Sequence, residues 1–170
     1  MSDGSLKLRG RVRAVLGDNI DTDMIYPGRY LNITDREQTA EHLFELAFAE
    51  IRLSLEAGDF IVAGWNFGCG SSREQAAAAL KFAGAGAVIA GSFARIFFRN
   101  AINLGLPAVV SPEASRACVA GDELEIDLVA GEIRNVTQGR VVEAAALDPR
   151  AVELIAAGGL IPYLKRKYAA

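Results

Sequence analysis

The chain has 170 residues, of which 51% are hydrophobic and 23% charged, so it can bury a core but is too short for two ordinary domains. Its 21 acidic and 18 basic side chains give a net charge of −3, which argues against a protein that mainly neutralises nucleic-acid phosphates. No secretory signal opens the sequence, and no apolar run reaches the roughly 18 residues of a membrane span. We therefore expect one domain over residues 1–170, in the cytoplasm, without nucleic-acid or membrane partners.

The composition also limits the metal chemistry that this chain can support. His42 is the only histidine, and the two cysteines, Cys69 and Cys118, lie far apart in the sequence. Four Cys or His ligands for zinc, or the cysteines that hold an iron–sulfur cluster, cannot be assembled from this set. Two cysteines also cannot form a disulfide framework. We expect no metal site in this chain.

The first predicted element is a half-buried strand over residues 6–16. Along it, apolar side chains alternate with a row of basic ones, which is typical of a strand with one solvated face. Residues 17–31 then show neither a helical nor a strand period, and long irregular segments in small domains are often functional. We expect residues 18–33 to be mobile in the isolated chain, because they lack periodic apolar anchors.

Capping patterns predict where the next helices begin. Residues 34–37 form a capping box that opens a helix to about Phe48, with His42 near its surface. Residues 72–75 form a second box, with Ser72 as the N-cap, and this helix ends near the glycines at 84 and 86. Ser92 is expected to cap a helix over residues 93–104.

Short apolar strands alternate with these helices. They fall at residues 60–63, 87–90 and 106–110, which indicates a βαβ unit with a parallel pair. A short helix begins at Pro112, a hairpin follows over residues 123–136, and two helices at 149–157 and 160–167 close the chain. The order of elements predicts an α/β domain with a parallel central sheet and antiparallel additions.

The loop over residues 64–73 is the strongest candidate site. It leaves the carboxyl end of a predicted parallel strand and enters a helix, which is where open α/β folds bind ligands. Two of its glycines permit close backbone approach, and the N–H groups of a helix N-terminus attract anions. Ser71, Ser72 and Arg73 add two hydroxyls and a guanidinium fork that matches a carboxylate. The expected ligand is a small carboxylate.

Two alternatives to this interpretation remain. A phosphate site fits less well, because no P-loop spacing is present and Arg73 stands where a dinucleotide fingerprint needs its third glycine. In the other alternative, Ser72 merely caps the helix and the glycines merely turn the chain. The pattern favours a functional site over this structural explanation.

Four blocks of the chain resemble one known family. Residues 68–76, Gly-Cys-Gly-Ser-Ser-Arg-Glu-Gln-Ala, resemble the signature of the swivel domain in the aconitase superfamily, which often has histidine where Gln75 stands. Residues 18–31, 92–107 and 157–164 resemble the small subunits of 3-isopropylmalate dehydratases. The resemblance implies a swivel domain with β/β/α layers and a hydro-lyase that acts on hydroxy-di- or tricarboxylic acids.

The resemblance also implies roles for individual residues. Ser71 would be the general base, acting as an alkoxide, and Ser72 and Arg73 would bind a substrate carboxylate. Asp23 would orient a partner group at the subunit junction, and Thr22 would contact substrate. Nearby donors and cations must stabilise a serine alkoxide, because serine is normally protonated.

Substrate choice is expected to depend on the residues that follow Tyr30 and Leu31. Several family members carry an arginine here, whereas this chain has Asn32 and Ile33. Ile33 could line an apolar pocket for an isopropyl or methyl group, and Asn32 cannot form an ion pair with a distal carboxylate. The resemblance therefore implies interconversion of 2- and 3-isopropylmalate through isopropylmaleate, in leucine biosynthesis. Alternatives are 2,3-dimethylmalate, citramalate and, least favoured, homoaconitate-type acids.

The resemblance places the [4Fe–4S] cluster in a large subunit, where its iron would activate the leaving hydroxyl. This chain would bind no cofactor itself and would be active only in a heterodimer or heterotetramer with that large subunit. A non-catalytic module that binds anions or RNA is the alternative from another functional class. The net charge of −3 argues against an RNA-binding module.

Overall fold

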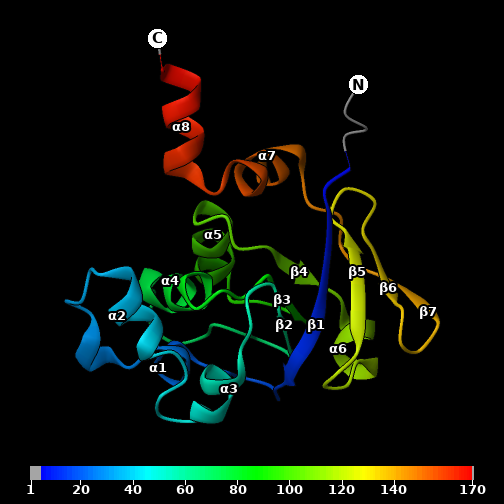
Figure 1. The fold of residues 1–170 in the computed structure, drawn as a ribbon, viewed down its shortest axis with the longest axis horizontal. Coiled ribbons are helices and arrows are strands. Elements are labelled where there is room, and N and C mark those ends of the chain that lie inside the picture. The colour runs from blue at the N-terminus through cyan, green and yellow to red at the C-terminus, as the bar shows by residue number, and fades with distance from the viewer. Residues whose placement is uncertain (1–4, 170) are drawn as a thin grey trace.

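Seven strands form one mixed sheet in this computed structural model, which describes residues 5–169. The strand order is β4-β3-β2-β1-β5-β6-β7 (Figure 1). The parallel part contains β1 Lys7–Val15, β2 Phe60–Ala63, β3 Ala87–Ala90 and β4 Ala108–Val110. The antiparallel part adds β5 Glu123–Asp127, β6 Glu132–Asn135 and β7 Arg140–Glu143. The predicted α/β class is therefore confirmed, but β7 was not predicted.

Side-chain patterns explain which strands are central. Every residue of β2 and of β3 is buried, as expected for parallel strands covered on both faces. In β1, Val12 is buried while Arg9 and Arg11 are exposed, which confirms the predicted half-buried strand. The hydrophobic core extends from the parallel strands and their covering helices to buried side chains of the antiparallel strands, such as Leu124, Ile126 and Ile133.

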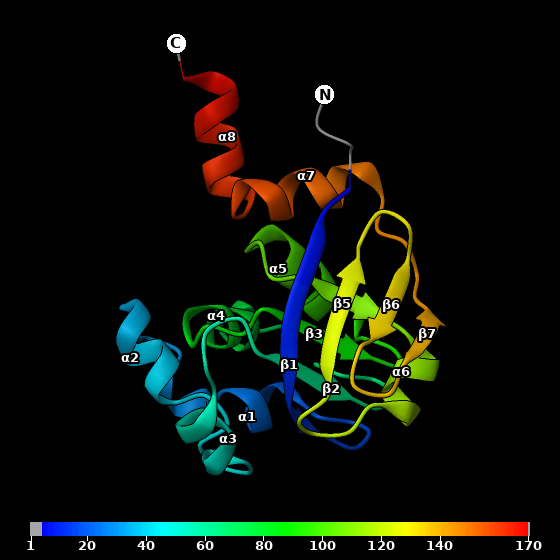
Figure 2. The ribbon, with the colours of Figure 1, turned by 45° about the vertical axis from the view of Figure 1, so that its right-hand side comes forward.

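The sheet curls until its two edges approach each other. The Ala145 amide, just after β7, donates to the Val110 carbonyl of β4 at 2.8 Å, and Ser111 Oγ donates to the Glu143 carbonyl at 2.6 Å. The helix α6, Pro112–Ala117, contacts β2, β3 and β7, and Ser111 caps it by accepting from the Ala114 amide. The helix α6 thus lies between the parallel strands and β7, and Figure 2 shows it beside the antiparallel strands.

Five helices form a row in which neighbouring helices are in contact. Their bounds are α2 Arg36–Glu41, α4 Glu74–Phe82, α5 Arg95–Asn103, α7 Pro149–Ala157 and α8 Leu160–Tyr168. Each contacts the next, and α8 projects from the body in both ribbon views (Figures 1 and 2). Within the described residues, no helix has the length and apolar character that a membrane crossing requires.

The helix that was predicted to run to Phe48 is in fact two helices. Asp35, rather than Thr34, caps α2 by accepting from the Gln38 amide at 2.9 Å. This helix ends at Glu41, and Phe44 then adopts a left-handed backbone with φ of 55°. A separate helix, α3, covers Ala49–Ser54.

The other two predicted serine caps are also wrong. The N-caps of α4 and α5 are Arg73 and Ala94, and in the described chain neither makes a side-chain cap bond. Ser92 Oγ instead accepts from the Asn66 amide at 2.8 Å. Ser72 is therefore not used as a helix cap.

Residues 18–33 are more structured than the sequence indicates. They contain α1, Thr22–Ile25, and a 3-10 helix, η1, Gly28–Tyr30. Ile20, Ile25 and Tyr26 are buried to 3%, 0% and 0% exposure. The segment has no periodic anchors, as expected, but these three irregularly spaced side chains are buried, and its mobility in the isolated chain stays a prediction.

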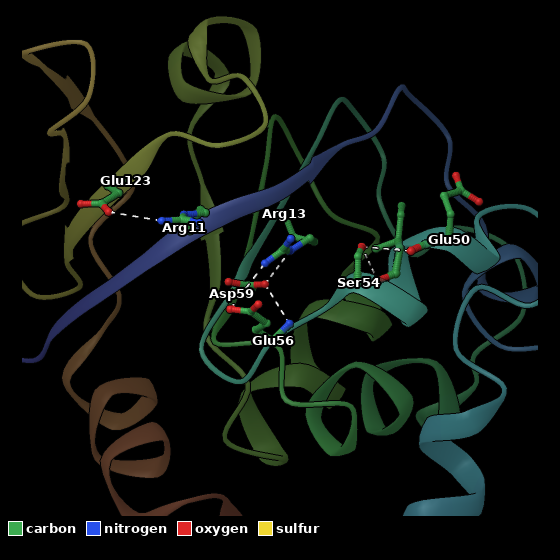
Figure 3. A network of polar contacts seen from close by, with 8 residues as sticks. Arg11, Arg13, Glu50, Ser54, Glu56, Asp59 and Glu123 are labelled. Atoms are coloured by element: carbon green, nitrogen blue, oxygen red, sulfur yellow. Dashed lines mark hydrogen bonds and ion pairs between the residues drawn. The ribbon is translucent and has the colours of Figure 1, made fainter.

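A partly buried ion pair connects β1 to the chain before β2. Asp59 is buried, and its Oδ2 accepts from Arg13 Nε at 2.7 Å and from the Glu56 amide at 2.8 Å. The Arg11–Glu123 pair nearby lies on the solvent side, with an N–O distance of 3.7 Å (Figure 3). Because the first pair is largely buried, loss of one partner should lower the stability strongly. The second pair is exposed to solvent, so loss of one partner should cost little.

We expect Asp59→Ala to lower the free energy of unfolding by about 2 kcal/mol, because it leaves Arg13 and the Glu56 amide without their acceptor. The matched variant Glu123→Gln should cost less than about 0.5 kcal/mol. Urea unfolding of both variants measures the difference. Equal losses would contradict the assigned role of Asp59.

Candidate active site

The loops that follow β1 and β2 remain paired after the sheet ends. Three amide-to-carbonyl bonds of 2.8–2.9 Å form this ladder, from Asn19 to Trp65, from Gly68 to Ile20 and from Thr22 to Cys69. The loop after β3 joins it, because the Phe67 amide donates to the Ser92 carbonyl at 3.0 Å. Three loops are thus aligned at the carboxyl edge of the parallel strands, where α/β folds place ligands.

Close approaches explain two of the three glycines of the loop after β2. Gly68 has a φ of +81°, and a Cβ there would collide with the ring of Phe97. Phe97 packs edge-on against Phe67 with ring centroids 5.2 Å apart, so it cannot easily move. A Cβ on Gly64 would collide with Asp18, whose Oδ1 accepts from the Trp65 amide at 2.8 Å.

Ser71 and Ser72 lie at the open surface where this loop enters α4, and both side chains are exposed. Arg73 follows as the N-cap residue of α4. Since Ser72 does not cap this helix, the capping part of the structural alternative is wrong, whereas the contacts of Gly64 and Gly68 fit its other part. The two serines lie at the N-terminal end of α4, toward which the first amide groups of the helix point. The partial positive charge at this end favours an anionic ligand or an ionised oxygen.

Arg73 forms an ion pair with Asp23 across the two loops. The Arg73 side chain is 19% exposed, whereas that of Asp23 is 56% exposed. The guanidinium lies against Gly28, where a Cβ would be 3.0 Å from Nη1, and the Gly28 amide donates to Asp23 Oδ1 at 3.2 Å. Asp23 therefore orients Arg73 of its own chain. The sequence did not identify Gly28, although Pro27-Gly28 marks a turn.

The remaining predicted substrate residues occupy different environments. Thr22 is 2% exposed and lies behind Gly70, so its side chain presents almost no open surface. Asn32 is exposed and Ile33 is half-buried. Gln75 does not form the expected capping box; its Nε2 donates to the Leu31 carbonyl at 3.3 Å and thereby connects α4 to this segment.

Metal-binding side chains are not grouped together in the part of the chain that the structure describes. Across residues 5–169, no three His, Cys, Asp or Glu side chains are placed to hold a metal ion together. Cys69 is half-buried on the loop before Ser71, whereas Cys118 is buried far along the chain. Burial, aided by the charge of Asp122, raises the pKa of the Cys118 thiol to about 11.

We expect Gly68→Ala to destabilise the chain by about 3 kcal/mol, because the left-handed backbone and the contact with Phe97 both disfavour a side chain. Gly139→Ala is the matched control, since Gly139 has a φ of +67° but open space around it. Backbone strain alone should cost the control about 1 kcal/mol. Urea unfolding measures both, and equal losses would show that the Phe97 contact is unimportant.

We also expect iodoacetamide at pH 8 to alkylate Cys69 and leave Cys118 intact in the folded chain, because a raised pKa leaves Cys118 without reactive thiolate. Peptide mass spectrometry after digestion locates the adduct. Chain unfolded in urea should be labelled at both positions. Comparable labelling of Cys118 in the folded chain would contradict its burial.

Comparison with known proteins identifies the family. The aconitase C-terminal domain family matches residues 19–113. The 3-isopropylmalate dehydratase small subunit of Moorella thermoacetica is 55% identical over 151 residues, covering 89% of this chain and 91% of the relative. The 2,3-dimethylmalate dehydratase small subunit of Eubacterium barkeri is 50% identical over 148 residues, covering 87% and 91%.

A solved structure gives the same result for the fold. The crystal structure of a 3-isopropylmalate dehydratase from Methanocaldococcus jannaschii is 42% identical, has a TM-score of 0.86 and covers 96% of both chains. The family match over residues 19–113 includes the serine-containing loop, and the solved structure has the same overall fold. The chain belongs to the aconitase C-terminal domain family, among the small subunits of the 3-isopropylmalate dehydratase type.

Proposed function

We propose that this chain is the small subunit of a hydro-lyase that interconverts 2- and 3-isopropylmalate in leucine biosynthesis. The observation that carries the proposal is the surface at the N-terminus of α4, where Ser71 and Ser72 adjoin an arginine that is already oriented by Asp23. Membership of the family supports the same activity.

Ser71 is the general base in this proposal. Its hydroxyl is exposed at the N-terminus of α4 and stands two residues before Arg73. The helix dipole and the guanidinium both favour the alkoxide over the hydroxyl. The alkoxide takes the proton from the carbon next to a carboxylate while hydroxide leaves the neighbouring carbon. Readdition of water with the opposite regiochemistry gives the isomer.

Arg73 binds a substrate carboxylate through its planar fork, and Ser72 donates a further hydrogen bond. Because Asp23 and Gly28 hold the guanidinium on one side, its orientation is set before substrate arrives. An arginine that is already oriented loses less side-chain entropy on binding. Thr22, which is buried behind Gly70, supports the loop that presents these groups.

The site needs a second chain to become an enclosed pocket. Both serines lie on open surface, and the relatives are named as small subunits, so we propose that a large subunit covers them. We place the [4Fe–4S] cluster in that subunit, because the donors of this chain do not fit one. The two free cysteines suit the cytoplasm, where we place the enzyme.

We propose that Ile33, with Asn32 beside it, selects the substrate through an apolar contact. Ile33 is half-buried in the segment that Gln75 connects to α4. The second candidate is a related acid, because similar identities join the chain to small subunits of an isopropylmalate/citramalate isomerase (49%) and a 2,3-dimethylmalate dehydratase (50%). Parallel assays with three acids, 2-isopropylmalate, citramalate and 2,3-dimethylmalate, on one reconstituted enzyme distinguish these candidates.

We expect Ser71→Ala to lower the turnover of the enzyme reconstituted with its large subunit by about a thousandfold, because no other group replaces the base. Arg73→Lys should raise the KM about tenfold, because the bidentate fork is lost. Steady-state kinetics with 2-isopropylmalate measures both effects. Gel filtration controls for subunit assembly, which both variants should retain. Normal turnover in the assembled Ser71→Ala enzyme would overturn the role of Ser71.

A further inference from the structure

The only histidine of the chain belongs to a compact polar cluster beside the substrate segment. Glu45 is at its centre and accepts three hydrogen bonds, from Arg29 Nη2 at 2.7 Å, from Tyr30 Oη at 2.9 Å and from His42 Nδ1 at 2.6 Å. We call these four residues the Glu45 cluster. It joins the 3-10 helix η1 to the turn between α2 and α3.

Aromatic stacking strengthens the cluster. The rings of Tyr30 and His42 lie nearly parallel, with an angle of 12° and centroids 3.6 Å apart. Burial alone would raise the pKa of Glu45, but the hydrogen bonds from His42, Tyr30 and Arg29 outweigh it and lower that pKa. Glu45 is thus a carboxylate at neutral pH, with three donors directed at it.

The turn that carries His42 and Glu45 is itself fixed. Phe44, between them, is fully buried and has a left-handed backbone. Its amide donates to the Ile25 carbonyl at the end of α1 at 2.8 Å. His42 and Glu45 are therefore attached to the core and give η1 a fixed point of contact.

The other side of η1 faces the candidate active site. Gly28, the first residue of η1, packs against the guanidinium of Arg73 and donates to Asp23. Leu31, just after η1, accepts from Gln75 at the start of α4. Within η1, Gly28 thus contacts the groups proposed to hold the substrate, while Arg29 and Tyr30 belong to the Glu45 cluster.

We propose that the Glu45 cluster positions residues 28–33 against Arg73 and so sets the affinity of the site for the substrate carboxylate. His42 and Glu45 are positioning residues that act through Tyr30 and do not touch substrate. The inference rests on the proposed function, because it concerns the substrate of that reaction. It assigns a role to His42, which the sequence placed only near the surface of a helix.

Kinetics of the reconstituted enzyme test the proposal. Glu45→Gln weakens all three hydrogen bonds, whereas Tyr30→Phe removes one donor and keeps the aromatic stack. We expect Glu45→Gln to raise the KM about tenfold and Tyr30→Phe to raise it about threefold. The kcat should stay within about twofold of the wild type, because only binding of the substrate carboxylate is weakened. Glu41→Gln removes a charge from exposed Glu41 on α2 and should leave both constants unchanged.

A spectroscopic measurement tests the cluster independently of activity. The small subunit is labelled with ¹³C-histidine and combined with unlabelled large subunit, so that His42 gives the only labelled imidazole signal. The Tyr30 ring current should shift its carbon-bound protons upfield, and Tyr30→Leu should move them downfield. No change on this substitution would show that the stack is absent in solution and would overturn the proposal.

The kinetic outcomes separate the two claims. A wild-type enzyme that turns over none of the three acids refutes the proposed function, and the positioning role falls with it. An active wild type whose KM is unchanged in both Glu45→Gln and Tyr30→Phe overturns the positioning role alone. So does a fall in kcat without a rise in KM, because that pattern would place the cluster in the chemical step. If Glu45→Gln does not assemble, Tyr30→Phe decides.

Discussion

The parallel pairing of β1 with β2 continues past the end of the sheet as a ladder of backbone hydrogen bonds. Where the two strands end, the Leu16 amide donates to the Val62 carbonyl at 2.8 Å and the Gly64 amide to the Gly17 carbonyl at 3.0 Å. Beyond it, the same pairing reaches Cys69. Backbone bonds of this kind fix two loops without depending on long side chains. Asp23 and Arg73 can therefore meet, although fifty residues separate them in the sequence.

The strand–loop–helix unit that carries the two serines could be located from the sequence, because its signals are local. Three glycines, two serines and an arginine follow a short apolar strand and precede an alanine-rich helix, and this order specifies a strand–loop–helix unit. The helix starts were harder to predict. Ser72 and Ser92 have the right residue type for caps, but the Ser92 hydroxyl bonds to Asn66, 26 residues away. Tertiary contacts outweighed local capping preference there.

The segment 18–33 shows what periodicity cannot reveal. Its buried residues Ile20, Ile25 and Tyr26 follow no regular spacing, because the chain passes through two very short helices. The roles of Asp18 and Gly28 depend on partners more than forty residues later in the chain. Nothing in the neighbouring sequence encodes those partners. The Glu45 cluster was also missed, because Tyr30 and Glu45 lie 15 residues apart on two different turns.

Trp65, the only tryptophan of the chain, gives the molecule an intrinsic optical probe. Its indole is 47% exposed and lies 3.2 Å from the point that a Cβ on Gly91 would occupy, while its amide is held by Asp18. All indole emission from the isolated subunit thus originates on the loop that ends at the proposed base. The wavelength and quenching of that emission depend on the polarity and water around this single ring, so the fluorescence reports on the surroundings of the loop that carries the proposed base.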